Sequence, residues 1–292
     1  MIEIDPTVDF VCKMLLGNPA HSRLTIHFLN AVLRTESPIV EVEYLNPFVM
    51  QEFELDKLAI LDILACDDQG RRLNIEVQRT SQGGLPERLV YYASTQLVEQ
   101  IQEGEGYHLL RPSIGICLLN AKLFPNLADY HQQFRLRTHT GLELTNCLEI
   151  HTLELPKYAR RGDNQEVHDP LDQWMDFFCN AKGSMPDALR TRLPSPVFGE
   201  AIGVLEMISK TPDQRRYYDA RMKWERDEST RIALAKAELE KAVADGKLGQ
   251  IHLLQGLLGE PMSKPEALRS MSPSALDELI EGLNTKVRNR LK

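Results

Sequence analysis

The 292-residue sequence is poor in cysteine and has no spacing of cysteine or histidine that is typical of a metal site. Its five cysteines are odd in number and widely scattered, and none forms a Cys-x-x-Cys pair. This pattern argues against a disulfide framework and against a cysteine-ligated zinc ion. The eight histidines contain no His-x-x-x-His or His-Glu-x-x-His spacing, so zinc chemistry based on histidine is unsupported as well.

Long apolar runs are also missing. No stretch approaches the roughly 20 apolar residues that a bilayer-spanning helix needs. The N-terminal residues Met1 to Pro6 are acidic, where a secretory signal would be basic. The overall composition, 42% hydrophobic and 26% charged, is that of an ordinary globular protein. We therefore expect a cytoplasmic protein without a membrane partner.

An excess of positive charge is absent too. The chain has 34 lysines and arginines against 42 acidic residues, which gives a net charge of −8. A protein that held nucleic acid by bulk electrostatics would be basic, so any DNA binding must come from a local patch and should depend strongly on salt. Lys157, Arg160 and Arg161 form the candidate patch, against the alternative that loop charges are simply solvated.

One carboxylate stands where the sequence is otherwise apolar. Asp62 lies inside the strand-like run from Leu58 to Ala65. Desolvating a carboxylate there costs several kcal/mol unless a partner compensates for the lost water. Asp62 is therefore either a strand-edge residue, a member of a buried ion pair, or a ligand.

The next segment decides how we interpret Asp62. From Leu73 to Gln78 apolar and polar residues alternate, as in a β-strand, so Glu76 and Gln78 share one face. A turn centred near Gln69 would fold the two segments into an antiparallel hairpin with Asp62 opposite Glu76. Two facing carboxylates repel each other, and a divalent cation such as Mg²⁺ or Mn²⁺ would reverse that sign. A slip of one residue in register would turn Asp62 to the other face.

The remaining pattern predicts an α/β domain followed by helices. Short helices are expected at residues 8–16 and 21–33, a strand at 39–44, a long helix from Pro86 to about Glu103, and an apolar strand at 113–119. Further expected elements are strands at 133–138 and 146–155, helices at 171–180, 196–209 and 212–245, and leucine-rich helical runs at 251–258 and 276–283. The charge-laced segment 212–245 is either a solvated helix or a coiled-coil partner.

The order helix, three strands, helix, strand, with an acid on the second strand and an acid-x-polar triplet on the third, resembles the core of PD-(D/E)XK nucleases. More narrowly, the chain resembles the Rpn family of recombination-promoting nucleases, also described as YhgA-like transposases, over residues 5–160. The segments that carry this resemblance are Asp9-Phe10 to Lys13, Phe28-Leu-Asn30, Asp62, Asn74-Ile-Glu76-Val-Gln78, Arg88-Leu-Val-Tyr91-Tyr92 and Gly106-Tyr107.

The resemblance implies a fold, a division into domains and partners. The implied fold is a restriction-endonuclease-like αβββαβ core with a mixed central sheet flanked by helices, plus a C-terminal helical extension. We expect a nuclease-like domain at 1–165, a helical extension packed on it at 166–211, a charged helix at 212–245 and a leucine-rich helical tail at 246–292. DNA is the implied partner, and a homodimer remains an open alternative to a monomer.

The implied activity is metal-dependent DNA endonuclease cleavage that promotes recombination or transposition. Asp62, Glu76 and Gln78 would be catalytic, and Asp62, Glu76 and the Val77 carbonyl would hold Mg²⁺ or Mn²⁺. The chain departs from the superfamily pattern at Leu61, where a proline is usual, and at Gln78, where a lysine is usual. Without that lysine a cation is missing from the site. A degenerate nuclease fold that binds DNA or a protein partner without cutting is therefore the alternative, and an oligomerising structural protein is the third.

Two helical groups flank these residues. Asp9 and Lys13 are four residues apart, which is typical of a surface ion pair, whereas the resemblance implies that their helix closes over the metal. Arg88, Tyr92 and Gln96 share one helical face that either contacts DNA phosphates or packs on the sheet.

Overall fold

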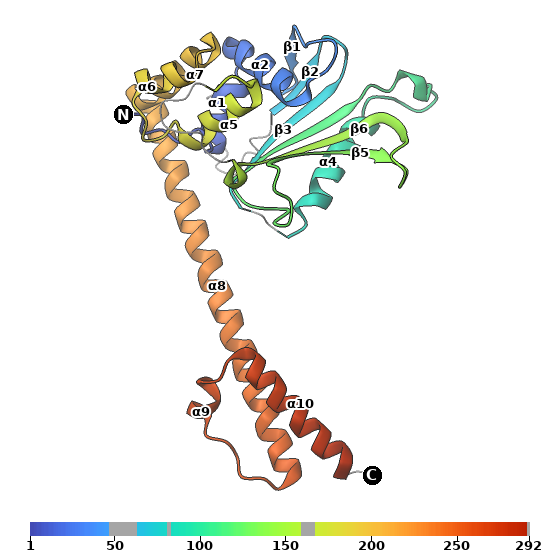
Figure 1. Cartoon of the computed structure of the whole chain (residues 1–292), viewed down its shortest axis with the longest axis vertical. Coiled ribbons are helices and arrows are strands. Elements are labelled where there is room, and N and C mark those ends of the chain that lie inside the picture. The colour runs from blue at the N-terminus through green and yellow to red at the C-terminus, as the bar shows by residue number, and fades with distance from the viewer. Residues whose placement is uncertain (47–62, 81–82, 159–166, 291–292) are drawn as a thin grey trace. The chain divides into compact units, whose positions relative to one another are not determined.

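The structure is a computed structural model that describes residues 1–46, 63–80, 83–158 and 167–290. Asp62, Arg160 and Arg161 lie outside these described residues. The chain divides into two compact units, Met1–Arg221 and Met222–Lys292, which are described separately. Figure 1 shows the ribbon of both units. Among the described helices, none is both long enough and apolar enough to cross a membrane.

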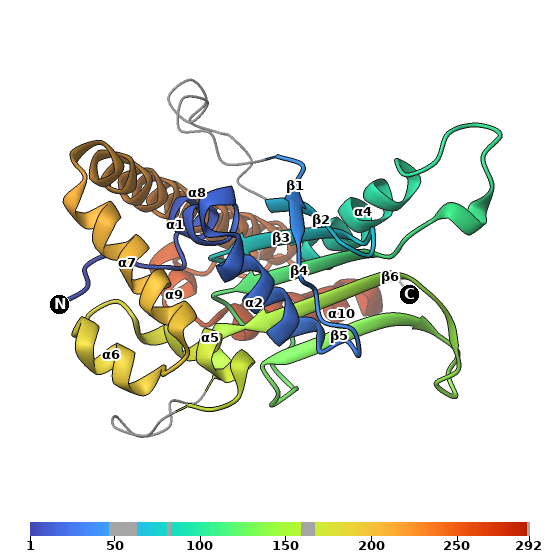
Figure 2. The ribbon, with the colours of Figure 1, turned by 90° about the horizontal axis from the view of Figure 1, so that it is seen from above.

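A six-stranded mixed sheet forms the centre of the first unit, with the strand order β1-β2-β3-β4-β6-β5. The strands are β1 (Val42–Tyr44), β2 (Ile63–Asp67), β3 (Arg72–Gln78), β4 (Ser113–Leu119), β5 (His131–Arg137) and β6 (Glu143–Glu154). The pairs β1–β2, β2–β3 and β5–β6 are antiparallel, whereas β3–β4 and β4–β6 are parallel. The carboxyl ends of β3, β4 and β6 therefore meet at one edge of the sheet (Figure 2).

Helix α4 (Leu85–Val98) packs on one face of this sheet. Its apolar stripe of Leu85, Leu89 and Ala93 forms a buried cluster with residues of β4 and β6, among them Cys117 and Ile150. Leu85 opens the helix and is followed by Pro86, which suits a first helical turn because that position needs no N–H partner. The predicted helix at 86–103 is thus confirmed with an earlier end, at Val98.

The other main helices of the first unit precede or follow the sheet in the sequence. They are α1 (Asp9–Leu16), α2 (Ser22–Leu33), α5 (Pro170–Asn180), α6 (Pro186–Arg192) and α7 (Pro196–Lys210). The ring of Trp174 in α5 lies 5.5 Å from that of Phe28 in α2 and 5.0 Å from that of Phe198 in α7, measured between centroids. Aromatic rings bury large apolar areas, so these contacts fasten the helices following the sheet to the helices preceding it.

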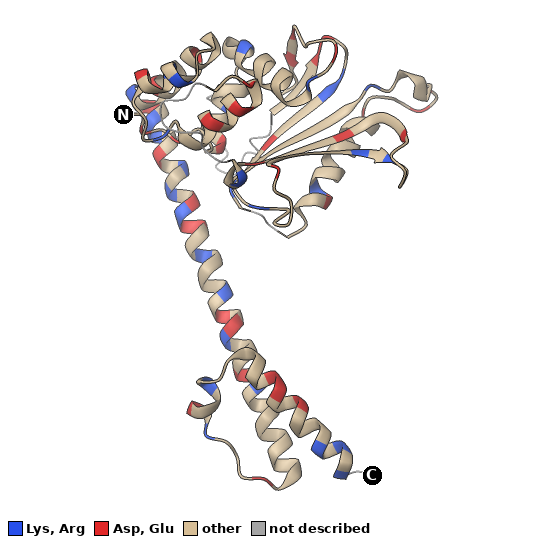
Figure 3. Ribbon diagram, viewed as in Figure 1, with Lys and Arg blue, Asp and Glu red and all other residues tan. Residues whose placement is uncertain are grey.

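The second unit contains most of α8 (Pro212–Leu258), together with α9 (Pro265–Arg269) and α10 (Pro273–Arg290). Its core consists of leucine and isoleucine side chains from all three helices: Leu248, Ile251, Leu254, Leu268, Leu276 and Leu283. Along the preceding part of α8, basic and acidic residues alternate (Figure 3). The predicted end of this helix near residue 245 is wrong, because α8 continues through Gly246 to Leu258. An interior glycine costs only about 1 kcal/mol, and burial of Leu248 and Ile251 just beyond it offsets that cost.

These elements agree with the fold class expected from the sequence. The protein has a mixed α/β core with helices on the sheet and a C-terminal helical region. The predicted strand at 113–119 matches β4 residue for residue, and β5 and β6 start two and three residues earlier than expected. Helix α6 was not predicted, because its seven residues give too short a pattern to show a period.

Gly17, which ends α1, provides a test of this packing. A Cβ built on Gly17 would lie 2.9 Å from both Cγ and the carbonyl oxygen of Lys13, and 3.1 Å from Cγ1 of Ile63. We expect Gly17→Ala to lower the free energy of unfolding by about 1–3 kcal/mol, because the helix would have to move away from β2. Urea denaturation measures this, with Gly203→Ala in α7 as the matched control. Open space surrounds Gly203, and alanine there should be neutral or stabilising.

Candidate active site

The β2–β3 hairpin has the register that the sequence predicted. Ile63 pairs with Ile75 and Leu64 with Asn74, so the ladder is centred on residue 69. The turn is fastened by Asp67, whose Oδ1 accepts from the backbone N–H groups of Gln69 (3.0 Å) and Arg71 (2.9 Å). Its Oδ2 accepts from Nε of Arg71 at 2.5 Å, and both side chains are buried. The predicted hairpin is therefore confirmed for residues 63–67 and 71–78, while Asp62 lies outside the described residues.

Glu76 is a buried carboxylate with an asymmetric environment. The residue is 2% exposed and lies on β3, between Ile75 and Val77. Its Oε1 accepts from Nε2 of Gln78 at 2.5 Å and from a terminal guanidinium nitrogen of Arg88 at 2.6 Å. Its Oε2 is buried and has no hydrogen-bond partner among the described residues. Within the described part of the chain, one oxygen of this carboxylate thus accepts two hydrogen bonds and the other accepts none.

The electrostatics of Glu76 follow from this burial. Desolvation raises the pKa of the Glu76 carboxyl above its ordinary value, and the positive charge and hydrogen bond of Arg88, with the Gln78 amide, offset only part of the rise. A buried acid with a raised pKa and an unsatisfied oxygen is an arrangement found more often in functional sites than in passive cores. A cation at Oε2 would favour the ionised form.

Asn74 belongs to the same face of β3. It is 5% exposed, and its side-chain Oδ1 is buried without a hydrogen-bond partner in the described part of the chain. Two unsatisfied side-chain oxygens thus stand on alternate residues of one strand. Asn74 was not predicted as a site residue, although it belongs to the segment that carries the family resemblance and the alternation along this segment places it on the face of Glu76.

The three residues predicted to share one helical face, Arg88, Tyr92 and Gln96, make different contacts in the structure. Arg88 reaches Glu76, and its own Nε is buried without a partner among the described residues. Gln96 accepts a long hydrogen bond of 3.4 Å from Oγ of Ser113 on β4. Tyr92 is half-buried, and its ring meets that of the exposed Tyr91 at 5.8 Å. The structure therefore brings Arg88 to the candidate site and places Gln96 against the sheet.

The residues predicted on the first helix are also separated. Asp9 forms a salt bridge with Arg221 of α8, in which the Nε–Oδ1 distance is 2.8 Å. Lys13 is 8% exposed, and its Cγ lies close to Gly17, 2.9 Å from where a Cβ of that residue would be. Lys157 of the predicted basic patch is buried against Glu154, with an Nζ–Oε1 distance of 2.9 Å. Lys157 therefore does not contribute to an exposed basic patch. The other two residues of the predicted patch, Arg160 and Arg161, lie outside the described residues.

The described residues alone do not assemble a full metal site. They contain no group of three or more histidine, cysteine, aspartate or glutamate side chains that could hold a metal ion. Glu76, Val77 and Gln78 are placed together on β3, whereas their predicted partner Asp62 is not among the described residues.

A helix, a three-stranded antiparallel start, a covering helix and a parallel fourth strand, with a buried acid on the third strand, define a nuclease-like α/β fold. The chain belongs to the PD-(D/E)XK nuclease family transposases, because the model of that family matches residues 6–235. The family resemblance inferred from the sequence is thereby confirmed. No curated protein and no solved structure matches the chain.

Proposed function

We propose that this protein is a metal-dependent DNA endonuclease whose site is built on the β2–β3 hairpin. The observation that carries the proposal is Glu76, a buried carboxylate on β3 with one oxygen that has no partner among the described residues. Membership of the family gives a nuclease-like role. Cleavage of DNA in recombination or transposition, in the cytoplasm, is the specific form that we propose.

The residues present suit a hard divalent cation such as Mg²⁺ or Mn²⁺. Oε2 of Glu76 is a buried carboxylate oxygen without a partner among the described residues, and oxygens of this kind are what these ions prefer. In the proposal Asp62, Glu76 and the Val77 carbonyl hold the ion. The observed register supports including Asp62, because Ile63 pairs with Ile75 and the neighbouring pair along the ladder would be 62 with 76. When bound, the ion supplies Lewis acidity at the scissile phosphate.

The protein's own side chains would orient the reactants. Gln78 carries a neutral amide two residues after Glu76, where it can hydrogen-bond the attacking water or a phosphate oxygen. Arg88 supplies a positive charge beside Glu76, and its buried Nε–H has no acceptor among the described residues. A phosphate oxygen is a suitable acceptor for that donor. Arg88 would thereby provide part of the positive charge that the family lysine, replaced here by Gln78, would supply.

The test is cleavage of supercoiled plasmid. Wild-type protein should convert the plasmid to nicked or linear forms with Mg²⁺ or Mn²⁺ and leave it supercoiled in EDTA. Asp62→Asn should remove the activity if Asp62 shares the cation with Glu76. Cleavage that persists in EDTA would show that the reaction does not need a metal ion. An active Asp62→Asn enzyme would show that Asp62 is not a ligand of that ion.

A second function is favoured by the contact of Gln78 with Glu76. The Gln78 amide donates to Oε1 of Glu76 at 2.5 Å and is thus engaged by the carboxylate in this structure. A site with a glutamine in this state could bind DNA, or a protein partner, without cutting it. In that case DNA would be retained in a gel-shift assay while the plasmid stayed intact with every divalent metal.

Metal binding should depend on pH through Glu76. At pH 8, Mg²⁺ at about 100 times its Kd should add about 2.7 kcal/mol of stability. That corresponds to a rise in Tm of about 5–10 °C for the larger unit. Protonation of Glu76 should abolish this increase in Tm as the pH is lowered. Since burial raises the pKa of Glu76, the increase should be lost at a higher pH than the ordinary pKa of about 4.3 would give.

The metal-free protein should show the opposite trend. A folded-state pKa above the unfolded value means that the contribution of Glu76 to stability is fully present below the unfolded pKa and is lost as pH rises through the folded pKa. Differential scanning calorimetry between pH 4 and 8 measures both trends. Glu76→Gln is the control, because it should abolish the Mg²⁺ response at every pH. A Glu76→Gln protein that Mg²⁺ still stabilises would place the cation elsewhere.

A further inference from the structure

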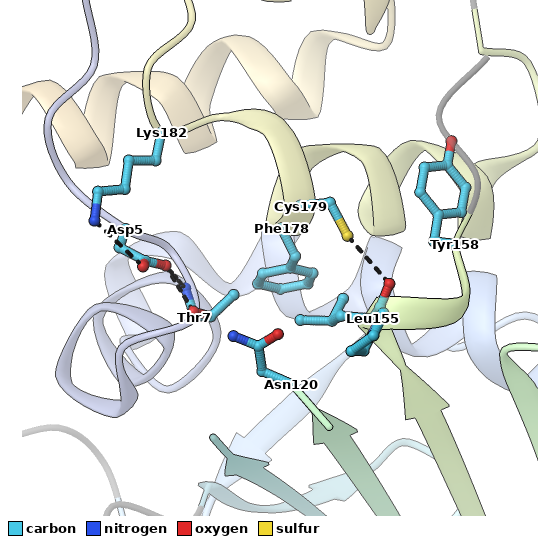
Figure 4. A pocket seen from close by; sticks show the side chains of 9 residues that line it. Asp5, Thr7, Asn120, Leu155, Tyr158, Phe178, Cys179 and Lys182 are labelled. Atoms are coloured by element: carbon cyan, nitrogen blue, oxygen red, sulfur yellow. Dashed lines mark hydrogen bonds and ion pairs between the residues drawn. The ribbon is translucent and has the colours of Figure 1, made fainter. Parts of the chain in front are cut away.

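A pocket of about 430 Å³ opens at the carboxyl ends of β4 and β6. Its lining comes from four places in the first unit: the segment before α1, the residue after β4, the turn after β6, and α5 with the residues that follow it. Asp5, Asn120, Leu155 and Phe178 represent these four places (Figure 4). Within the described residues, the hydrogen bonds of Glu76 come from Gln78 and Arg88, which are not among the residues that line this pocket.

The pocket adjoins the end of β3 on which the candidate metal ligands stand. The backbone N–H of Asn120 donates to the carbonyl of Gln78 at 2.8 Å. A guanidinium nitrogen of Arg79 lies 3.8 Å from Oδ2 of Asp5. Arg79 follows Glu76 by three residues, so no more than about 11 Å of backbone separates them. A DNA strand whose phosphate lies at Glu76 can therefore place a neighbouring nucleotide over this edge of the sheet.

The walls of the pocket suit a flat, partly polar ring. Phe178 and Leu155 lie at the apolar base of the pocket, where each is almost fully buried, and in Figure 4 the Phe178 ring lies between Thr7 and Leu155. The Asn120 side chain, drawn below that ring, makes no hydrogen bond within the described part of the chain. A side-chain amide has two donors and an acceptor, which is the chemistry that reads the edge of a nucleobase.

The mouth of the pocket carries the charge that a phosphodiester requires. Lys182 is half-exposed, and its Nζ lies 3.6 Å from Oδ2 of Asp5. Asp5 is itself held by Thr7, whose hydroxyl and backbone N–H donate to Oδ1 at 2.6 and 3.0 Å. Lys182 and Arg79 thus converge on one fixed carboxylate oxygen. Because the Lys182 side chain lines the pocket and is half-exposed, its ammonium group is the cation there that a phosphate of the strand can reach.

We propose that this pocket takes an unpaired nucleobase of the DNA strand that the enzyme cuts, and the inference rests on the nuclease function proposed above. A base inside a duplex cannot reach a pocket of this kind unless it is unstacked and unpaired. The protein therefore binds single-stranded or locally opened DNA in preference to intact duplex. Contacts of Asn120 with the edge of the base also supply affinity that a chain with a net charge of −8 cannot obtain from bulk electrostatics.

The test measures binding in EDTA, where no cleavage can occur. Fluorescence anisotropy would compare a labelled single-stranded oligonucleotide, the duplex of the same sequence, and a single strand whose sites are all abasic. Asn120→Ala should weaken binding of the normal single strand about tenfold and leave binding of the abasic strand unchanged. Lys182→Ala should weaken both, because it removes a phosphate contact. Asn126→Ala, at an exposed loop asparagine outside the pocket, is the matched control and should alter neither.

Each contrary result has a definite meaning. Equal affinity of wild type for normal and abasic strands, or tighter binding of the duplex, would overturn the pocket. So would displacement of the oligonucleotide by an equimolar mononucleotide, which would assign the pocket to a free nucleotide. If Asn120→Ala is less thermostable than wild type, its weaker binding could result from misfolding. The affinities of the wild-type protein for the normal and the abasic strand then decide whether the pocket binds a base. Base-dependent binding without plasmid cleavage would contradict the proposed nuclease function but not the base-binding pocket. Mg²⁺-dependent plasmid cleavage with base-independent binding would contradict the pocket but not the nuclease function.

Discussion

Replacing Glu76 by glutamine should abolish Mg²⁺-dependent plasmid cleavage. The substitution keeps the size of the side chain and a donor or acceptor at each terminal atom, but it removes the negative charge that would hold the cation. Metal-ion catalysis supplies several kcal/mol of transition-state stabilisation, so we expect the rate to fall by about a thousandfold or more. The initial rate of conversion of supercoiled to nicked plasmid, at saturating Mg²⁺, is the measurement.

Loss of folding must be distinguished from loss of charge in this experiment. The burial that raises the pKa of Glu76 also means that a neutral amide is tolerated there, so metal-free Glu76→Gln should unfold at a Tm close to that of wild type. Glu87→Gln is the matched control. It removes one carboxylate from the exposed first turn of α4, next to Arg88, and should leave the cleavage rate unchanged. If Glu76→Gln cuts at the wild-type rate, the β2–β3 hairpin is not the catalytic site.

The position of Glu76 could be predicted because short-range patterns determine it. Alternation from Leu73 to Gln78 assigns a face to each residue, and the polar loop between the two strands is short enough to fix the register. Helix α4 and strand β4 were predictable for the same reason, since each has a clear period and clear ends. Where local pattern and tertiary structure agree in this way, sequence alone is sufficient.

The partners of these residues could not be predicted, because they come from distant parts of the chain. The spacing of Asp9 and Lys13 suggested either a surface ion pair or a helix that closes over the metal, and neither alternative indicated that Asp9 binds Arg221, which is 212 residues away. The packing of the start of α8 on the N-terminal segment brings Arg221 to Asp9. The buried ion pair between Arg192 and Asp176, with an Nε–Oδ2 distance of 2.6 Å, joins helices α6 and α5 in the same way. Neither contact can be predicted from the periodicity of the sequence.

The continuous helix α8 shows a different reason for error. Gly246 suggested a helix end, since glycine is common just past helix C-termini. The structure overrides that local preference because residues on both sides of Gly246 remain helical and Leu248, Ile251 and Leu254 must reach the helices of the second unit. Propensity is a weak guide wherever burial of several large side chains opposes it.

The turn residue Asp67 carries the second large effect that we expect. Asp67→Ala should lower the free energy of unfolding by about 3–5 kcal/mol, because it leaves the guanidinium of Arg71 buried without its partner. It also removes the two hydrogen bonds from the backbone N–H groups of Gln69 and Arg71. Urea denaturation measures the loss. Asp187→Ala, which breaks a solvent-exposed ion pair with Arg190, should have little effect.

The loss at Asp67 should extend to the candidate site. Asp67 closes the turn that sets Ile63 opposite Ile75, and the same register determines which residue of the preceding strand faces Glu76. A loosened turn would let the strands slip, and a slip of one residue reverses the face of every side chain. The Mg²⁺-induced rise in Tm should therefore shrink in Asp67→Ala even at temperatures where the variant is folded. Asp67→Asn, which retains an acceptor for the turn, should recover most of the Mg²⁺ response while remaining less stable than wild type. A full Mg²⁺ response in folded Asp67→Ala would show that the turn contributes stability but does not position the site.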